Sequence, residues 1–384
     1  MKSVNWSYIF AAYLALLSFG LLDNVRGPFF PDLIQDMKLR DDQASWFFAL
    51  TSIIAFFGSI WAPKIQTLFG ALNGLRLGLL LLFSGFYMTT FANDMTFLLL
   101  ASSIFGLGMG MSQVFEHICI QEGAPLQLRR RLFNGLHSFY AAASILAPLS
   151  AGWVLNKGEG WRFGFKLVCI LPMLAFIYTL FVKNQKQHTT LQKVLKAKGM
   201  EFYHMLYLSV ILSLYVTAEL SISTRLVLYV QRTTSIEPAQ STFYLTTFFI
   251  FLLLGRLLMT IFDFKSLSSR QIIFLSLFAS LILYAIGLWY SPWLLALCGL
   301  TMAPMFGMTM DYIAHTFPSK SSYGISLSFA VGAVLIVSMH YFVGLMTEWY
   351  SIRQALILGP VFLALSIFLF LFEKKFFKTE EWHS

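Results

Sequence analysis

Several charged side chains stand inside long apolar runs, where a membrane would surround them. The first run carries Asp23 and Arg26, the fourth carries Glu116, and the seventh carries Glu219 and Arg225. An unpaired charge at the centre of a bilayer costs roughly 2.5–3.5 kcal/mol or more, so such residues face a cavity or a partner. Carboxylates in that position bind and release protons, and polar groups beside them hold solutes. This pattern indicates a transport pathway.

The apolar runs also dominate the composition. Of the 384 residues, 58% are hydrophobic and 12% are charged, and the mean hydropathy is +0.71. A water-soluble domain carries about 25% charged residues, so we expect an integral membrane protein. The runs reach about 20 residues or more, as transmembrane helices do, instead of alternating over ten residues as barrel strands do. The net charge of +9 lies in short loops, which indicates membrane topology and no nucleic-acid partner.

We predict an all-α membrane protein with twelve transmembrane helices in two pseudo-symmetric bundles of six. The expected spans are 6–33, 43–69, 71–92, 94–121, 130–156, 161–183, 202–231, 238–263, 270–290, 292–317, 321–347 and 352–373. The longest polar interval, "KNQKQHTTLQKVLKAKG" at 183–199, separates the sixth span from the seventh. The predicted domains are therefore an N-terminal bundle at 1–183, a cytoplasmic linker at 184–200, and a C-terminal bundle at 201–384 with a short cytoplasmic tail.

Lysine and arginine set the expected orientation, because cytoplasmic loops are enriched in both. The linker and the "RRR" of 129–131 fall on the same side as the N-terminus, and the segments on the opposite side hold few basic residues. We therefore expect a multi-pass protein of the cytoplasmic (inner) membrane with both termini in the cytoplasm. The first apolar run is expected to be a retained helix, since no small-residue cleavage site precedes Asp23.

Six plus six helices around a basic linker resemble the major facilitator superfamily. The segment "RRRLFNGLHSFYAAASILAPLSAGWVL" (129–155) resembles its fifth span, and "GEGWRFGF" (158–165) resembles the entry to its sixth. The loop at 63–74 departs from the family pattern, with Thr67 and Leu68 where an acid and a basic residue are usual. The departure concerns the family's inner-gate salt bridge and leaves the expected fold unchanged.

Within the superfamily, four segments are similar to the fucose:proton and glucose/mannose symporter group: "GLLDNVRGPFFPDL", "FGLGMGMSQVFE", "RLFNGLHSFY" and "YVTAELSISTRLVLYV". The resemblance implies that Asp23 and Glu116 are the protonatable pair. It implies sugar-hydroxyl contacts by Asn24, Gln113, Asn134, His137 and Glu219. Arg225 is a departure, because the group has an aromatic residue there.

The sequence also makes local predictions around these residues. Pro28 and Pro31 should break the first helix near its outer end. Asp23 and Arg26 are three residues apart and share a helix face, so a local ion pair that only neutralises itself is the alternative to a site. The glycines within 106–110 indicate close helix packing. Glu116 could instead serve as a structural hydrogen-bond partner to a neighbouring helix.

Other functions stay open at this point. Arg26 and Arg225, on the first and seventh spans, resemble the phosphate clamp of organophosphate antiporters, because guanidinium groups bind phosphate bidentately. They could also form a gate pair. Export of drugs or lipids is a further alternative, and a receptor or scaffold with a transporter fold belongs to another class. An enzyme is not expected, since neither metal-ligand spacings nor a nucleophile–base set is present.

The leading hypothesis is a secondary active transporter that moves a small hydrophilic solute, a monosaccharide, by proton-coupled alternating access. Its substrate-binding residues are Asn24, Arg26, Gln113, Asn134, His137, Glu219 and Arg225, and its proton-coupling residues are Asp23 and Glu116. It needs no cofactor and no metal, only the proton gradient, with sodium as the alternative coupling ion. The expected partners are the solute and membrane lipid, and the expected state is a monomer.

Overall fold

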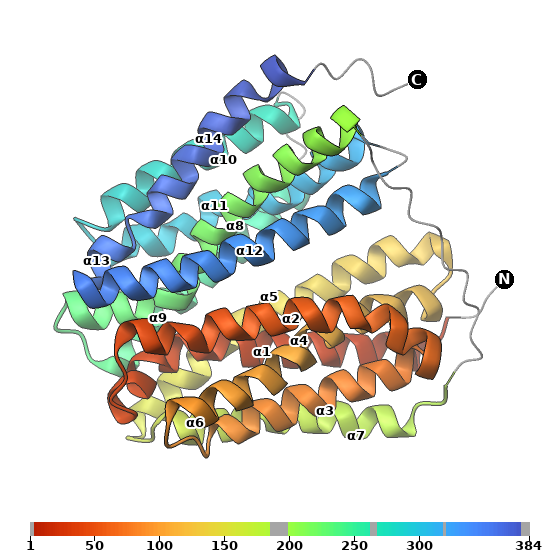
Figure 1. The fold of residues 1–384 in the computed structure, drawn as a ribbon, viewed down its shortest axis with the longest axis horizontal. Coiled ribbons are helices and arrows are strands. Elements are labelled where there is room, and N and C mark those ends of the chain that lie inside the picture. Colours follow the sequence, from red (N-terminus) through yellow and green to blue (C-terminus); the bar gives the residue numbers. More distant parts are fainter. Residues whose placement is uncertain (1–3, 185–198, 262–266, 318–319, 378–384) are drawn as a thin grey trace. The chain divides into compact units, whose positions relative to one another are not determined.

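In the computed structural model the protein is helical throughout the residues that the structure describes, which are 4–184, 199–261, 267–317 and 320–377. No strand occurs among those residues (Figure 1). The predicted linker at 184–200 lies mostly outside them. The side chains of some residues inside helices, including Asn134 and His137, are also outside the described part.

Twelve stretches of the described chain are long and apolar enough to cross a membrane, which confirms the predicted fold class and number of spans. The first six spans are α1 (Trp6–Asp36), α2 (Asp41–Phe69), α3 (Ala71–Thr89), α4 (Met95–Gly123), α5 (Leu126–Asn156), and α6 (Trp161–Val168) with α7 (Ile170–Phe181). The other six are α8 (Gly199–Thr233), α9 (Pro238–Ile261), α10 (Ser269–Gly287), α11 (Pro292–Thr316), α12 (Ser321–Trp349), and α13 (Ile352–Ala355) with α14 (Leu358–Phe376).

The chain divides into two compact units that repeat the same helix packing. The first unit is Met1–Thr190 with Ser235–Thr246, and the second unit is Leu191–Thr234 with Thr247–Ser384. In the first unit α1 packs on α4, α5 and α7, and α3 packs on α4 and α7. In the second unit α8 packs on α11, α12 and α14, and α10 packs on α11 and α14. The repeated pairs show the pseudo-symmetry that the sequence predicted.

Residues 235–246, which the sequence placed in the C-terminal bundle, group with the first unit. Within that unit, Gly152 of α5 leaves room for Thr242. A Cβ atom at Gly152 would lie 2.5 Å from the Thr242 hydroxyl oxygen. The beginning of α9 therefore packs as part of the first unit.

Three glycines let α4 approach its neighbours at backbone distance. They are Gly106, Gly108 and Gly110. A Cβ atom on Gly108 would lie 2.4 Å from the backbone nitrogen of Leu82 in α3, and one on Gly110 would lie 1.8 Å from the carbonyl oxygen of Ala55 in α2. Real Cβ atoms do not come this close to backbone, so only glycine fits. The predicted close packing is confirmed.

Helix α1 runs unbroken through Pro28 and Pro31, so the prediction that these prolines break it is wrong. Proline inside a helix removes one hydrogen bond and crowds a carbonyl, at a typical cost of about 3 kcal/mol. Packing offsets this loss here. Phe30, between the two prolines, contacts Phe48 of α2 edge to face, with ring centroids 5.0 Å apart. Neighbouring helices thus hold a segment whose local sequence disfavours helix.

The Gly-Trp-Arg motif at the start of α6 fastens this helix to the end of α1. The Trp161 backbone N–H donates to Asp32 Oδ2 at 2.6 Å, and the Trp161 indole N–H donates to Asp36 Oδ2 at 3.0 Å. Arg162 forms an ion pair with Asp36 and donates to the carbonyl of Ala92 at 2.6 Å. The motif therefore joins α1, α6 and the turn after α3 at one end of the first unit.

Two arginines have equivalent positions in the two units. Arg76 of α3 donates from Nη2 to the carbonyls of Thr179 and Val182, at 2.6 and 2.8 Å, where α7 ends. Arg270 of α10 donates from Nη2 to the carbonyl of Phe370 at 2.8 Å, in the last turns of α14. Neither α7 nor α14 ends at a glycine. Each arginine ties the last turns of one helix to a different span through hydrogen bonds to backbone carbonyls.

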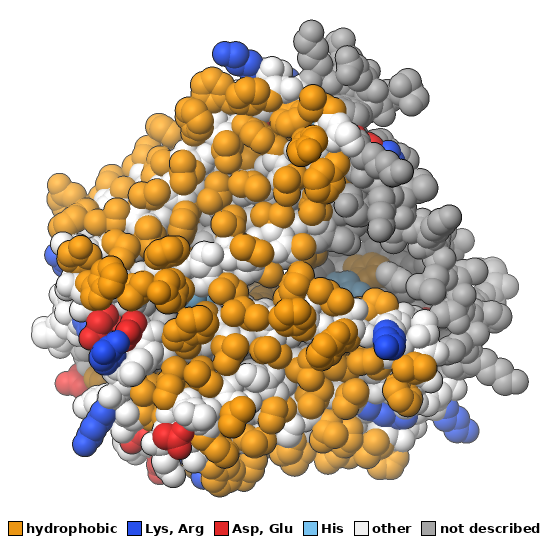
Figure 2. Space-filling view, in the orientation of Figure 1, with side chains coloured by type: hydrophobic (Ala, Val, Ile, Leu, Met, Phe, Trp, Pro, Cys, Tyr) orange, Lys and Arg blue, Asp and Glu red, His pale blue; other side chains and the backbone are white. Residues whose placement is uncertain are grey.

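Apolar side chains cover most of the face in Figure 2, and charged side chains lie mainly toward its margins. Many large leucine, isoleucine and phenylalanine side chains are exposed along the helices, for example Phe368 at 57% and Leu180 at 55%. Such a surface is stable in lipid and would aggregate in water. The chain is a multi-pass membrane protein.

Candidate substrate and proton site

Glu116 lies on α4, where the glycines hold it among closely packed helices. The residue is fully buried, and neither carboxylate oxygen has a hydrogen-bond partner among the described residues. The Nδ1 atom of His117 lies 3.8 Å from Glu116 Oε1, beyond hydrogen-bond distance. An ionised carboxylate in such a place loses its hydration without replacement. Glu116 is therefore chemically suited to carry a proton.

Gln113 and His117 stand one turn apart beside Glu116. The His117 ring donates from Nδ1 to the carbonyl of Gln113 at 2.7 Å and stacks on Phe133, with centroids 5.6 Å apart. The His117 side chain is 39% exposed. The half-buried amide of Gln113 has no hydrogen bond to any described residue. This face of α4 thus places an available amide next to a buried acid.

Asp23 and Arg26 form an ion pair within α1. Arg26 is 4% exposed. Its guanidinium lies over the rings of Phe48 and Phe105, at 4.9 and 5.3 Å from their centroids, and contacts the carbonyl of Phe47 at 3.5 Å. Asp23 is more accessible, with its side chain 21% exposed. The arginine is held as a packed and neutralised cation, and the carboxylate is the exposed member.

Glu219 and Arg225 of α8 do not repeat the Asp23–Arg26 ion pair of α1. Glu219 accepts a hydrogen bond from the hydroxyl of Tyr215, which lies 2.9 Å from the carbonyl of Met302. Arg256 of α9 attracts Glu219 electrostatically. Arg225 is 1% exposed. It follows Glu219 by six positions in α8, a spacing that turns the two side chains to different faces of the helix. The cation near Glu219 is therefore Arg256.

Of the remaining predicted substrate ligands, the structure describes the side chain of Asn24 but not those of Asn134 and His137. Asn24 of α1 donates from Nδ2 to the carbonyl of Gly20 at 2.8 Å and to the hydroxyl of Ser144 in α5 at 3.2 Å. Asn134 and His137 belong to α5, but their side chains lie outside the described residues. Helices α1, α4 and α5 of one unit thus carry six of the predicted site residues besides Arg26. The hydrogen bond to Ser144 joins Asn24 to α5.

A buried polar cluster in the second unit was not predicted. Glu373 and His204 are fully buried, and the His204 ring donates from Nε2 to Glu373 Oε1 at 3.0 Å. The Tyr312 hydroxyl donates to the same oxygen at 2.9 Å, and Arg270 forms an ion pair with the other. The ring of Phe377 stacks on His204, with centroids 4.4 Å apart. We call these five residues the Glu373 cluster, which joins α8, α10, α11 and α14.

The sequence held a partial signal for this cluster. Glu373 and Arg270 each stand at the edge of an apolar run. A charged side chain there ordinarily reaches water, so its position does not predict a buried partner. The acids Asp32 and Asp36 were missed for the same reason. An acid followed by two lysines at a helix end, as at 373–375, is a local hint that the acid has an inward partner.

Comparisons with known proteins agree with this architecture. The sequence matches the Major Facilitator Superfamily over residues 12–326. Facilitated glucose transporter member 8 of solute carrier family 2, from Mus musculus, is 29% identical over 177 residues, which cover 45% of this chain and 36% of that protein. The chain therefore spans about a third of the length of this relative.

Solved structures share the fold over nearly the whole chain. A D-xylose-proton symporter superposes with a TM-score of 0.79 at 14% identity, covering 98% of this chain and 99% of the symporter. The superfamily transporter FucP, in its outward conformation, superposes with a TM-score of 0.65 at 14% identity, covering 96% and 99%. At such identities the likeness shows the fold alone.

The family match covers most of the chain, and the twelve spans, the repeated helix pairs and the structural neighbours agree with it. This family consists of transporters and not of enzymes, as the sequence indicated. The chain belongs to the Major Facilitator Superfamily.

Proposed function

We propose that this transporter imports a monosaccharide together with a proton across the cytoplasmic membrane, by alternating access, with both chain termini on the cytoplasmic side. The observation that carries the proposal is the buried carboxylate of Glu116, which has no hydrogen-bond partner among the described residues. A group of this kind binds a proton in one state of a transport cycle and releases it in another. Asp23, the more exposed acid of α1, is the second proton site of the proposal.

The polarity of the candidate site supports a neutral hydroxylated solute. Gln113 offers an amide without a partner in the described chain, and Glu219 offers carboxylate oxygens. Arg26 is neutralised by Asp23 and covered by phenylalanine rings. An anion clamp needs guanidinium groups that can turn toward a phosphate, and Arg26 lacks that freedom. The names of the relatives, a glucose transporter and a D-xylose-proton symporter, support the same solute class.

We predict that Glu116→Gln abolishes uphill accumulation of the sugar and leaves downhill exchange in place. Glutamine keeps the size of the side chain and cannot carry the proton, so sugar movement loses its coupling. The measurement uses proteoliposomes with an imposed proton gradient, and then the same vesicles in counterflow without a gradient. We expect accumulation to fall at least tenfold, with counterflow within about twofold of wild type.

The matched control is Glu122→Gln. Glu122 lies on the same helix, and its carboxylate already accepts a hydrogen bond from Gln66 at 3.5 Å. We expect this variant to retain both accumulation and counterflow. Wild-type accumulation by Glu116→Gln would contradict the proton role. If accumulation depends on an imposed sodium gradient and does not depend on the proton gradient, the coupling ion is sodium and not the proton.

We also predict that a neutral monosaccharide raises the melting temperature of the purified protein and that its phosphate ester does not. A ligand that binds only the folded state adds about 2.7 kcal/mol to its stability at one hundred times Kd. A thermal-shift panel of aldohexoses, pentoses, their phosphates and small organic anions measures this effect. Stabilisation by the phosphates alone would contradict the sugar proposal and favour an organophosphate carrier.

A further inference from the structure

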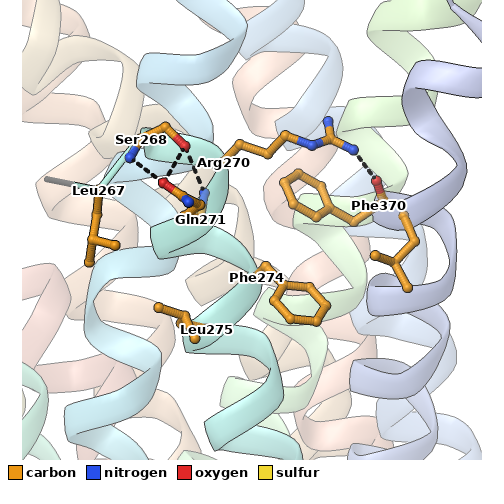
Figure 3. Close-up of a pocket in the computed structure, with 8 residues that line it drawn as sticks. Leu267, Ser268, Arg270, Gln271, Phe274, Leu275 and Phe370 are labelled. Carbon is orange, nitrogen blue, oxygen red and sulfur yellow. Dashed lines mark hydrogen bonds between the residues drawn. The ribbon is translucent and has the colours of Figure 1, made fainter.

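A groove opens on the second unit beside the first turn of α10 and the last turns of α14 (Figure 3). Its volume is about 500 Å³. Two membrane-spanning helices form its walls, and both have one end here, α10 its beginning and α14 its end. The lining residues that the argument uses are Arg270, Gln271, Phe274, Leu275, Phe370 and Leu371.

The α10 wall changes from polar to apolar over one helical turn. Arg270 and Gln271 stand in the first turn, and Phe274 and Leu275 stand four residues further along. Residues four apart lie on the same helix face. The polar pair therefore stands at the end of the groove where α10 begins, and the apolar pair stands one turn further along the helix, as the labelled side chains in Figure 3 show.

The α14 wall repeats this gradient in the opposite chain direction. Phe370 and Leu371 line the groove, and Lys374 and Lys375 follow them by four residues on the same faces. Both lysines are exposed. Because α14 ends where α10 begins, the cations of both helices gather at one level of the membrane, above apolar side chains from both.

The charge at this level is positive. Arg270 pairs with the buried Glu373, donates to the Phe370 carbonyl and lies over the Phe370 ring at 4.6 Å from its centroid. Unlike the Arg26 side chain, which is 5% exposed, the Arg270 side chain is 23% exposed. A guanidinium has five donor hydrogens, and the Arg270 Nε has no hydrogen-bond partner within the described residues. No acidic side chain lines the groove in the described part of the chain. The Glu373 cluster thus fixes the arginine and leaves its Nε–H as a donor. The exposed Lys374 and Lys375 stand one turn beyond the groove lining, and Lys375 Nζ lies 5.8 Å from the ring centroid of Phe372.

We propose that this groove binds an anionic phospholipid. The phosphate lies among Arg270, Lys374 and Lys375, and an acyl chain lies along Phe274, Leu275 and Leu371. Charge-assisted bonds from guanidinium to phosphate are among the strong hydrogen bonds of proteins. Basic pockets between spans hold anionic headgroups. A soluble anion would use the cations alone, whereas the apolar walls, Leu275 at 50% and Leu371 at 57% exposure, need a lipid tail.

The first unit supplies an internal contrast. A second groove of about 510 Å³ lies on α1, α5, α6 and α7, and its lining includes Leu21, Leu146, Leu149 and Leu174. Ser150 is polar, and no charged side chain lines this groove in the described residues. The two grooves match in volume and differ in charge. An acyl chain fits both, and only the groove with Arg270 selects the headgroup.

The test is native mass spectrometry of the purified full-length protein with phosphatidylglycerol or phosphatidylcholine added at equal concentration. For the wild type we expect about a tenfold preference for phosphatidylglycerol. Leu275→Trp fills the groove, and the double variant Lys374→Gln/Lys375→Gln removes the exposed cations. Both variants leave the Glu373 cluster untouched. We expect each to lose most of the preference.

The controls apply the same changes elsewhere. Leu149→Trp fills the uncharged groove, and Lys157→Gln/Lys166→Gln removes two exposed lysines of the first unit. Both should keep the wild-type preference. The proposal is overturned if the wild type takes up the two lipids equally, or if Leu149→Trp lowers the preference as much as Leu275→Trp. It is also overturned if inorganic phosphate displaces the lipid at millimolar concentration, because the cations alone would then form the site.

Discussion

Glu373→Gln is expected to destabilise the protein by about 3 kcal/mol or more, because it breaks a buried charge cluster at its centre. The carboxylate accepts from His204 and Tyr312 and pairs with Arg270. Glutamine keeps one acceptor oxygen and replaces the other by a donor group that points at the arginine. Arg270, whose side chain is 23% exposed, then keeps its charge without a counter-ion.

Thermal or denaturant unfolding of the purified variant measures this loss. Asp42→Asn is the matched control, since Asp42 pairs with Arg40 at the surface, where the Arg40 side chain is 62% exposed. Exposed ion pairs contribute about 0–1 kcal/mol, so this variant should unfold close to wild type. If Glu373→Gln unfolds no earlier than Asp42→Asn, the cluster does not stabilise the second unit.

In α4, Gly110→Ala should be more disruptive than the same substitution at Gly106 or Gly108. The new Cβ atom would lie 1.8 Å from the Ala55 carbonyl oxygen and 2.9 Å from the Ser59 backbone nitrogen. Both atoms are backbone, so no side-chain rotation relieves the contact and α2 must move away from α4. Overpacking of this kind typically costs 1–3 kcal/mol and occasionally more. We expect at least the upper end of that range, together with loss of transport, because Glu116 lies on the same helix.

The control for this substitution has the opposite expected sign. Gly307 lies inside α11, and a Cβ atom there would have no atom within 4 Å. Alanine exceeds glycine in helix propensity by about 1 kcal/mol, so Gly307→Ala should raise the melting temperature slightly. Equal melting temperatures for the two alanine variants would show that α2 and α4 separate without cost, contrary to the packing described above.

The number and positions of the transmembrane helices were predictable because each one is a long apolar run in the sequence. The sixth span was predicted to begin at 161, and α6 begins at Trp161. The glycines of α4 predicted close packing for a reason that is also local. Pro28 and Pro31 misled the prediction, because the contact that keeps α1 helical comes from Phe48 of another helix. Local propensity was overridden there by packing that no short window of sequence contains.

The candidate site was predictable only where partners are close in sequence. The Asp23–Arg26 pair follows from a spacing of three on one helix. By contrast, Glu219 is attracted electrostatically by Arg256 of α9, although Arg225 stands nearer to it along the chain. The Glu373 cluster joins residues that are 169 and 103 positions apart. Such contacts depend on which helices are neighbours, and hydropathy does not encode that order.

The arginine contacts at the ends of α7 and α14 have a consequence for protein engineering. The last turns of each of these helices accept hydrogen bonds from an arginine of a different span, Arg76 of α3 for α7 and Arg270 of α10 for α14. A chimaera that takes its third or ninth span from a relative would lose this contact unless that span carries an arginine at the same position, whereas a foreign sixth or twelfth span still offers backbone carbonyls. In each half of this transporter, the span that supplies the arginine is therefore the one to keep during recombination.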